Sequence, residues 1–547
     1  MEVFESVVNW LNNLVWSTPQ QFPIMVVVLL GFGIFITLRL GFVQLRRFAH
    51  GVKSVMGVYD NPDDTGDVNH FQALTTALSA TVGIGNIAGV AIAIHYGGPG
   101  ALFWMWVTAF FGMAIKYTEC TLAVQYRVKN DDGSVSGGPM YYIEKGLGPN
   151  WKWLAVFFAS MAVICSFLTG NAVQANTVAD TMYSTFQIPS WVSGIVTATF
   201  VGVVIVGGIK RIGQVTARLM PLMAIIYVLG ALVILFLNAG SVIPAFGTIV
   251  SSAFTPEAGL FGVGSGLFLT TLVWGIKRGL FSNEAGQGSA PIAHGAAKTE
   301  EPVREGVVAL LEPFIDTILV CTMTGLVIVS TGVWEEKHDM VFDPSNRDNA
   351  VEITDGSNTL IIEDGEPVNG IVMRNDFETD KFYIDEDQTE LFSGTMVFEG
   401  EGGRFVDAAG AAVPTVYTKI IENGAPLTSL AFEKGLAPIF PYGKHIVTFC
   451  VLLFGISTAI SWSYYGDRSI QYLAGDGAIL PYKVVYLGMH FLGAIFPLAT
   501  VWAIGDIALG LMTFPNIIAL FALSGSVAVA SKTYFNKMDE LEAKGEA

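Results

Sequence analysis

The stretch that decides the fold is Thr75-Thr76-Ala77-Leu78-Ser79-Ala80-Thr81-Val82-Gly83-Ile84-Gly85-Asn86-Ile87-Ala88-Gly89. It is uncharged and apolar enough to lie in a membrane, yet Gly83, Gly85 and Asn86 stand mid-segment, where helix formers are expected. Glycine costs a helix interior about 1 kcal/mol relative to alanine. Unwound backbone at membrane depth occurs only where it is buried or lines a cavity. The stretch therefore indicates either a broken membrane helix or small-residue helix packing.

The rest of the chain has the composition of a polytopic membrane protein. It has 547 residues, of which 52% are hydrophobic and only 14% charged, with a mean hydropathy of +0.53. Soluble proteins carry about 25% charged residues. Apolar segments near the length needed to cross a bilayer predict an all-α protein with eleven spans, at residues 22–44, 70–95, 99–125, 152–182, 190–208, 215–239, 262–292, 303–333, 443–465, 483–503 and 509–531.

Basic residues orient these spans. With the N-terminus outside, the short outer loops 1–21, 96–98, 183–189, 240–261 and 504–508 contain no Lys or Arg. The inner loops and the C-terminal tail hold Arg46, Arg47, Lys53, Arg127, Lys129, Lys145, Lys210, Arg211, Lys298, Arg468, Lys532, Lys537 and Lys544. This positive-inside pattern predicts a multi-pass protein of the cell membrane with the N-terminus outside and the C-terminus in the cytoplasm.

Residues 334–436 form a different kind of segment, which this topology places outside. It holds 22 acidic and seven basic residues, so most of the net charge of −18 lies there. Short β-branched runs alternate with turn signals such as Asn369-Gly370, which predicts a small β-rich extracytoplasmic insertion. Asp385-Glu386-Asp387 is interpreted as a solvated face or, less favoured, as a divalent-cation site. Nucleic acid is excluded as a partner, since phosphate binding needs a basic surface.

A second irregular stretch runs from Trp274 to Ser289 and carries Lys, Arg, Asn and Glu within a predicted span. Such residues must face protein or water. The two irregular spans each open a block of five helices, and an odd block size inverts the second block. This is the outline of an inverted repeat with broken helices at matching places and a binding site between them.

Three motifs resemble those of one family, the alanine or glycine:cation symporters: 81–86 (Thr-Val-Gly-Ile-Gly-Asn), 170–176 (Gly-Asn-Ala-Val-Gln-Ala-Asn) and 278–286 (Arg-Gly-Leu-Phe-Ser-Asn-Glu-Ala-Gly). The resemblance runs from about residue 15 to the end, excluding the insertion. It implies a leucine-transporter-like 5+5 inverted repeat preceded by one extra helix. It also implies alternating-access uptake of a small neutral amino acid, alanine or glycine, coupled to Na⁺.

The resemblance assigns the substrate site residue by residue. Amides near Ile84 and Gly85 would hold the carboxylate, and carbonyls near Ala80 and Thr81 would accept from the ammonium group. At the presumed second break, Trp274, Gly275 and Ile276 would close the pocket and limit side-chain size. Independently of the family, Asn171 and Gln174 are spaced i,i+3 and so project from one helix face. They would line the pocket or hydrogen-bond to a neighbouring helix.

The same resemblance assigns a Na⁺ site to the hydroxyls of Ser457 and Thr458 and to carbonyls of Ser79 and Val82. Neutral oxygens suit a hard monovalent cation. A possible second cation site combines Asn86, Asp316 and Thr317. Asp316 would alternatively pair with Lys116 or Lys277 as a structural contact. Glu119, Glu284 and Arg278 are interpreted as gate or network residues.

These assignments divide the chain into six parts: the extra helix and inner loop (1–69), the first five-helix repeat (70–240), the start of the second repeat (241–333), the insertion (334–436), the rest of the second repeat (437–531) and the tail (532–547). Coupling to H⁺, or uptake of glutamine or serine, is the alternative within the transporter class. A membrane-anchored sensor that uses the insertion is disfavoured, because an anchor needs no broken helices.

An enzyme is not expected. The seven histidines are scattered mostly over span ends and loops, and none forms a catalytic or metal-binding motif. No cofactor is expected besides Na⁺ as the coupling ion. The partners expected are a small amino acid, Na⁺ and the lipid bilayer, while protein partners are not indicated.

Overall fold

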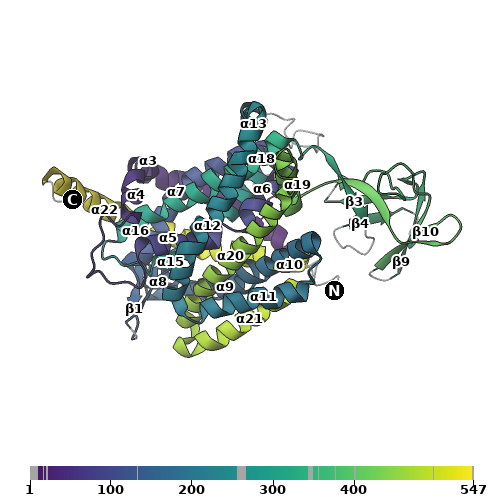
Figure 1. Ribbon diagram of the computed structural model, residues 1–547. Helices are drawn as coiled ribbons and strands as arrows, with labels where there is room; N and C mark the ends of the chain where they lie inside the picture. Colours follow the sequence, from purple (N-terminus) through teal and green to yellow (C-terminus); the bar gives the residue numbers. More distant parts are fainter. Residues whose placement is uncertain are drawn as a thin grey trace.

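The fold was examined in a computed structural model. It describes residues 10–16, 18–19, 23–131, 133–254, 267–342, 349–354, 357–375, 377–399, 402–496 and 498–544. A helical bundle makes up most of the molecule, and a β-rich segment projects from one end of it (Figure 1).

The N-terminal half of the bundle includes two helices that are interrupted by π-helical turns. Its elements are α2 (Ile24–Arg39), α3 (Val43–Arg46), α4 (Phe48–Val55), α5 (His70–Thr81), η1 (Gly85–Gly89), α6 (Val90–Gly97), α7 (Gly100–Gln125), β1 (Val128–Lys129), β2 (Val135–Ser136), α8 (Pro139–Gly146), η2 (Pro149–Trp151), α9 (Lys152–Phe167), η3 (Leu168–Ala172), α10 (Val173–Phe186), α11 (Ser190–Ile205) and α12 (Gly208–Leu237).

The C-terminal half surrounds the β-rich segment in sequence. Its helices are α13 (Ala239–Ser252), α14 (Leu267–Asn283), α15 (Ala290–His294), α16 (Pro302–Ala309), α17 (Leu311–Pro313), η4 (Phe314–Cys321), α18 (Thr322–Thr331), α19 (Gly424–Leu436), α20 (Gly443–Ala474), η5 (Asp476–Ala478), α21 (Ile479–Ile495) and α22 (Leu498–Lys544).

The chain has the helices of a multi-pass membrane protein. Within the described residues, seven helices are long and apolar enough to cross a membrane, or eight if α5 and the bent helix after it count as one span. Shorter apolar helices are α2, α11 and α13. Large apolar side chains such as Phe200, Leu222 and Phe236 are exposed on the outside of the bundle, as expected for a surface that faces lipid.

Two predicted loops are helical in the structure. Residues 240–261 contain α13, although they were expected to be an outer loop, because Pro244 lies in the second turn of the helix and does not end it. Residues 504–508 lie within α22, and the chain turns earlier, between α21 and α22. The eleven predicted spans each overlap a helix of the structure, with shifted ends.

The broken helix predicted from the opening stretch is present. A capping box at Asn69 and Gln72 starts α5: the Asn69 side chain accepts from the Gln72 N–H at 2.8 Å, and the Gln72 side chain accepts from the Asn69 N–H at 3.2 Å. The helix ends at Thr81, and the following helix leaves at an angle of 55°. Gly83 and Gly85 lie in this break.

The β-rich segment has a hydrophobic core of its own. It comprises a five-stranded sheet in the order β11-β10-β9-β5-β6, a three-stranded sheet β4-β7-β8 and the pair β12-β3. Phenylalanines from strands and loops pack together in its core, among them Phe342 of β3, Phe405 of β10 and Phe382 of the loop between β8 and β9. The strands are β3 (Lys337–Phe342), β4 (Asn349–Ile353), β5 (Thr359–Glu363), β6 (Glu366–Pro367), β7 (Gly370–Arg374), β8 (Phe377–Glu378), β9 (Gly394–Glu399), β10 (Gly402–Asp407), β11 (Ala412–Val413) and β12 (Val416–Ile421).

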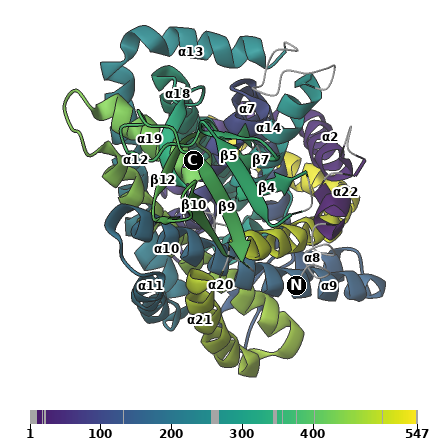
Figure 2. The same ribbon diagram turned by 90° about the vertical axis from the view of Figure 1, so that its right-hand side faces the viewer.

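The β-rich segment rests on the helix that follows the break. His95 of α6 hydrogen-bonds the Asn375 carbonyl at 2.9 Å, and its ring packs edge-on against Phe377. The last part of the predicted insertion is helical: α19 packs on the bundle, where Thr428 donates to the Ile87 carbonyl at 3.0 Å. Figure 2 looks onto the strands, which lie in front of the helices.

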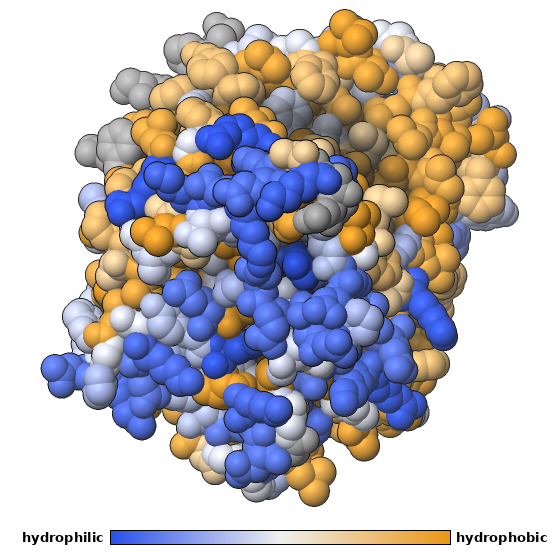
Figure 3. Space-filling view, turned by 90° about the vertical axis from the view of Figure 1, so that its left-hand side faces the viewer, coloured by the Kyte–Doolittle hydropathy of each residue, from blue (hydrophilic) through white to orange (hydrophobic). Residues whose placement is uncertain are grey.

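The opposite end of the bundle carries α3, α4, α16 and the hairpin β1–β2 (Figure 1), and we call it the polar end. Arg46, Lys53 and Lys129 lie in its elements. In the space-filling view, hydrophilic side chains gather over the central and lower part of this end, and hydrophobic ones lie along its upper and right margins (Figure 3). The basic loops and the acidic strands therefore occupy opposite ends of the molecule.

Candidate functional site

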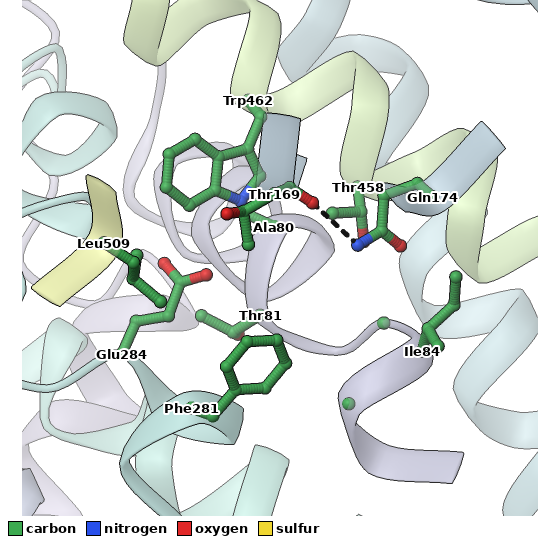
Figure 4. Close-up of a pocket in the computed structure, with 12 residues that line it drawn as sticks. Ala80, Thr81, Ile84, Thr169, Gln174, Phe281, Glu284, Thr458, Trp462 and Leu509 are labelled. Carbon is green, nitrogen blue, oxygen red and sulfur yellow. Dashed lines mark hydrogen bonds between the residues drawn. The ribbon is translucent and has the colours of Figure 1, made fainter. Parts of the chain in front are cut away.

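A small cavity lies in the bundle between the two irregular stretches. Its lining comes from five separate segments of the chain: Ala80, Thr81, Gly83, Ile84, Gly85, Thr169, Gln174, Phe281, Glu284, Thr458, Trp462 and Leu509. Figure 4 shows the Glu284 carboxylate, the Phe281 ring and the Trp462 indole around it. About 20 Å³ is open to the centre of a water molecule, which is enough for water. A larger ligand requires a lining side chain to move.

The first break supplies backbone groups to this cavity. Ile84 and Gly85 stand at the start of η1, where a helix leaves N–H groups without an intrahelical partner. Ala80 and Thr81 stand at the end of α5, where carbonyls are left in the same way. Amides that favour an anion and carbonyls that favour a cation thus meet at one point.

The second break lies beyond the position expected for it. Helix α14 continues through Trp274, Gly275 and Ile276 and ends at Asn283. Gly275 packs so closely on α7 that an added Cβ would lie 2.4 Å from the Ala101 carbonyl oxygen. Trp274 stacks on Tyr96 with ring centroids 4.5 Å apart. These three residues are absent from the cavity lining, and the expectation that the helix breaks there is wrong.

Glu284 forms the true second break. Its φ of 53° is left-handed, and its N–H donates to the Leu280 carbonyl at 2.9 Å, which closes the last turn of α14. Gly286 and Gly288 also have positive φ, at 84° and 85°, where glycine is favoured. The break brings Phe281 and Glu284 to the cavity, with Phe281 3.4 Å from the Cβ that an alanine at Gly85 would carry.

Asn171 and Gln174 do not share one environment. The π-helical turn η3 shifts the helical register between them, so the i,i+3 argument fails. Gln174 lines the cavity, donates to the Thr169 carbonyl at 3.1 Å and keeps its Oε1 unpartnered in the described structure. Asn171 instead faces α21: it donates to the Tyr486 carbonyl at 2.7 Å and contacts His490 at 2.6 Å.

The residues predicted for the Na⁺ site are brought together beside the first break. Thr458 of α20 donates to the Ser79 carbonyl at 3.0 Å. Within the described residues, the buried hydroxyl oxygens of Ser79, Ser457 and Ser461 have no hydrogen-bond partner. Val82 caps the end of α5 and is fully buried. Buried oxygens without partners are costly, and such oxygens are the ligands a hard cation takes.

Asn86, Asp316 and Thr317 also lie together, and they join the two broken helices. The Asn86 amide donates to Asp316 Oδ1 at 2.6 Å, and the hydroxyls of Thr317 and Ser282 each donate to Asp316 Oδ2 at 2.7 Å. The Asn86 side-chain oxygen accepts from the Gly83 N–H at 2.9 Å. Asp316 is thus held by neutral donors, whereas Lys116 forms its ion pair with Glu312 at 3.1 Å.

Six lining residues were not assigned to the site from the sequence: Gly83, Thr169, Phe281, Glu284, Trp462 and Leu509. Thr169 directly precedes the motif 170–176, and Phe281 and Glu284 lie inside the motif 278–286. These two motifs therefore pointed to the segments that line the cavity. Glu284 was interpreted as a gate or network residue. Trp462 directly follows the hydroxyl-rich stretch 457–461 of α20, while Leu509 is an ordinary apolar residue of α22 that no sequence pattern marks as part of a site.

Outside the cavity, Asp385 of the acidic triplet is engaged by its own loop. It accepts from the backbone N–H groups of Thr389 and Glu390 at 3.0 and 2.8 Å. These contacts favour a solvated turn over a divalent-cation site.

The comparisons with known proteins agree with the geometry. The model of the sodium:alanine symporter family matches residues 1–356 and 405–546. The residues it omits, 357–404, lie among the strands of the β-rich segment.

Curated relatives match over nearly the whole chain. The sodium/alanine symporter AgcS of Methanococcus maripaludis is 41% identical over 99% of both chains. The putative sodium/proton-dependent alanine carrier protein YrbD of Bacillus subtilis is 33% identical over 96% of this chain and 91% of its own length. The probable sodium/glutamine symporter GlnT of the same organism is 30% identical over 97% and 91%.

Proposed function

Because the chain belongs to the sodium:alanine symporter family, we propose that it carries a small neutral amino acid, alanine or glycine, into the cell together with Na⁺. The family makes it a cation-coupled amino-acid symporter of the membrane. One observation supports the finer proposal: residues at two helix breaks line one small cavity, and residues next in sequence to its lining, Ser79 and Ser457, carry buried hydroxyls without partners in the described structure. Its backbone, hydroxyl and amide groups suit a zwitterion and a monovalent cation, and a short side chain requires the least movement of the lining.

The backbone of the first break binds the substrate in this proposal. Amides of Ile84 and Gly85 hold the carboxylate, and carbonyls of Ala80 and Thr81 accept from the ammonium group. Gln174 and the Glu284 carboxylate, both in the cavity wall, offer further acceptors. Phe281 and Trp462 limit the side chain, a role first expected of Trp274, Gly275 and Ile276.

Na⁺ binds next to the substrate, between α5 and α20. The hydroxyls of Ser457 and Thr458 and the carbonyls of Ser79 and Val82 are its proposed ligands. The ion replaces the hydrogen bond from Thr458 to Ser79 and satisfies the unpartnered oxygens. It thereby orders the end of α5, which raises the affinity for the amino acid, and the amino acid raises the affinity for Na⁺ by the same factor. The Asn86, Asp316 and Thr317 cluster is the proposed place for a second cation.

We further propose that helices 70–240 and 241–531 form a 5+5 inverted repeat that rocks about the cavity. The two breaks, after Thr81 and after Asn283, support it. The polar end faces the cytoplasm and the β-rich segment faces outside, because basic loops favour the inner side. Substrate and ion bind from outside, and binding of both permits opening at the polar end.

Uptake of labelled alanine into proteoliposomes tests the proposal. The purified full chain is reconstituted, and an inward Na⁺ gradient, an inward H⁺ gradient or neither is applied. Glycine, serine and glutamine serve as unlabelled competitors. We expect accumulation only with the Na⁺ gradient and competition by glycine. Accumulation without any cation gradient would overturn the proposal.

Coupling to H⁺ or uptake of glutamine is the second candidate, since YrbD and GlnT carry such names. Accumulation driven by H⁺ alone would favour the first of these. Inhibition by glutamine together with uptake of labelled glutamine would favour the second.

A further inference from the structure

A run of buried charged side chains connects the interior of the bundle to the polar end. We call it the ionic chain, and it consists of Asp60, His70, Glu305, His294, Glu312, Lys116 and Glu119. Of these, only Asp60 is substantially exposed, with 45% of its side chain accessible, while the carboxylates, the ammonium and His294 farther along are fully buried. The symport proposal uses none of these groups.

Successive members of the ionic chain are in contact. His70 contacts Asp60 at 3.6 Å and hydrogen-bonds Glu305. Glu305 contacts His294 at 2.5 Å, and His294 contacts Glu312 at 2.6 Å. At the inner end, Lys116 lies 3.1 Å from Glu312 and 4.0 Å from Glu119.

The geometry at His294 requires a bound proton. Its Nδ1 faces Glu305 and its Nε2 faces Glu312, so both ring nitrogens lie within hydrogen-bond distance of carboxylate oxygens. A neutral imidazole has one N–H, and an ionised carboxylate only accepts. A neutral ring can therefore donate to only one of the two ionised carboxylates. Both contacts are hydrogen bonds only when one more proton is bound to the His294–Glu305–Glu312 group.

The charges of the buried members lead to the same conclusion. Glu119, Glu305 and Glu312 are three fully buried carboxylates in a cluster with one ammonium, that of Lys116, which contacts Glu119 and Glu312. Two negative charges remain, and protons on His70 and His294 neutralise them. A buried charge without a partner is costly, so the cluster favours both imidazolium ions.

Other charged groups nearby do not alter this balance. On the side of α16, Arg304 is close enough to act on His70 and pairs with Asp64 at 3.4 Å. On the inner side, Glu284 acts on Lys116 through space. The Arg304–Asp64 pair adds no net charge and Glu284 adds a negative one, so neither replaces the protons on the two rings.

A metal ion fits the same place less well. Cys120, His294 and Glu312 have ligand atoms within 4.8 Å of one another. However, His294 already uses both ring nitrogens, and the Lys116 ammonium lies against Glu312. A metal ion at Nε2 would break the hydrogen bond to Glu312 and place a divalent cation beside the Lys116 ammonium, although Nδ1 would still donate to Glu305. The arrangement favours a proton.

The ionic chain also joins helices that must separate if the polar end opens. His70 is the first residue of α5, His294 is the last residue of α15, and Glu305 lies between them on α16. α5 and α15 flank the two breaks on the polar side. The two histidine–glutamate contacts therefore hold the segments of both broken helices to α16.

We propose that His70 and His294 are proton-binding sites, loaded from the polar end through Asp60, whose protons hold α5 and α15 to α16 and close that end. The part that concerns opening rests on the proposed transport function, whereas the protonation of the rings does not. Loss of a proton leaves Glu305 and Glu312 without compensation, and their repulsion favours the hydrated, open arrangement. Alkaline pH at the polar end therefore favours opening.

Nuclear magnetic resonance of ring-labelled histidine in the full chain, purified into lipid nanodiscs, tests the protonation directly. At pH 8 an ordinary histidine is neutral, since its pKa is about 6.5. We expect two imidazolium signals from the seven histidines. His490 is an internal control, because it is equally buried but faces the neutral groups of Asn171 and Thr197, and it should be neutral.

Variants assign the signals. His294→Gln should remove one imidazolium signal and His70→Gln the other, while His445→Gln, at an exposed position, should remove neither. The number of imidazolium signals in the wild type tests the protonation even if the buried variants fail to fold. No imidazolium signal at pH 8, or a pair of signals that both survive His294→Gln, would overturn the proposal.

Uptake by the same preparations separates this proposal from the symport proposal. If the wild type shows two imidazolium signals but takes up no amino acid under any gradient, the proton sites stand and the proposed function fails. If it transports alanine with Na⁺ but its histidines are neutral, the proposed function stands and the proton sites fail. In a protein that does both, His294→Gln should flatten the dependence of uptake on pH between 6 and 9, and an unchanged pH profile would contradict the role in closure.

Discussion

The cavity and the ionic chain are two buried polar regions that differ in whether their polar groups have partners. At the cavity, hydroxyls such as those of Ser79 and Ser457 are buried without partners. Along the ionic chain, each charged group lies next to an opposite charge. Neutral oxygens that lack a partner or, like the Thr458 hydroxyl, make a single hydrogen bond suit a ligand that binds and leaves, because little must be displaced. Paired charges hold helices together.

The difference predicts that substitutions in the two regions have separable effects. Changes at the cavity should alter transport and leave stability nearly intact. Changes in the ionic chain should lower stability first. Single and double substitutions in each region test whether transport and stability change independently.

Removing the two hydroxyls of the proposed Na⁺ site should have the largest effect on transport. Hydrogen bonds or ion contacts to charged groups contribute about 1.5–3 kcal/mol each, so Ser457→Ala with Thr458→Ala should reduce Na⁺-driven uptake by roughly a hundredfold or more. Ser469→Ala on the same helix is the matched control, because this buried hydroxyl already donates to the Tyr465 carbonyl at 2.8 Å. Equal loss in both variants would show that the effect is structural.

Lys116→Met should have the largest effect on stability. It leaves Glu312 and Glu119 without their ammonium partner, and breaking a buried ion pair costs about 3–5 kcal/mol. Thermal unfolding of the detergent-purified protein would show a marked fall in Tm. Lys537→Met removes an exposed pair with Glu301 and should cost at most about 1 kcal/mol. A Lys116→Met protein as stable as the wild type would contradict the claim that the paired charges of the ionic chain hold the helices together.

Gly83→Ala should weaken Na⁺ binding without unfolding the protein. The added Cβ would lie 2.7 Å from Thr458 Oγ1 and push that hydroxyl away from the Ser79 carbonyl. We expect the Na⁺ concentration for half-maximal uptake to rise roughly tenfold, equivalent to about 1.4 kcal/mol. Gly89→Ala is the control, since nothing lies within 4 Å of its Cβ, and its Na⁺ dependence should be that of the wild type.

The smallest effect is expected in the β-rich segment, at Asp385. Hydrogen bonds from the Glu390 N–H and from Thr389 lower the pKa of this carboxyl below its ordinary value. A lowered pKa in the folded state stabilises the fold at neutral pH, and this contribution is lost as the pH falls through the folded pKa, below about 4. The protection of the amides in loop 385–390 of the full chain against hydrogen exchange, corrected for the slower intrinsic exchange at low pH, should therefore fall on acidification. Asp385→Asn should remove most of this pH dependence, and an undiminished dependence would contradict the assignment.

The sequence predicted the first break because its signal is local. Gly83 and Gly85 interrupt an uncharged apolar segment, and this interruption is visible without knowing which helices pack against it. The second break was misplaced because glycine has two uses. Gly275 and Gly279 let α14 lie close to α7, whereas the break uses the left-handed residues Glu284, Gly286 and Gly288.

Other features depend on contacts that no local pattern contains. The π-helical turn η3 separates Asn171 from Gln174, and its register shift is invisible in the residue spacing. The ionic chain joins His70, Lys116 and Glu305, which are far apart in sequence and come together only through packing. The sequence showed that such buried charges need partners, but not which partners they have.

The central claim is that Na⁺ and the amino acid bind next to each other between the two broken helices. Binding of labelled alanine to the purified full chain, measured over a series of Na⁺ concentrations, tests it most directly. We expect alanine affinity to rise with Na⁺ concentration, and we expect Ser457→Ala with Thr458→Ala to remove this dependence while the protein stays folded. Alanine affinity that is the same with and without Na⁺ would contradict it.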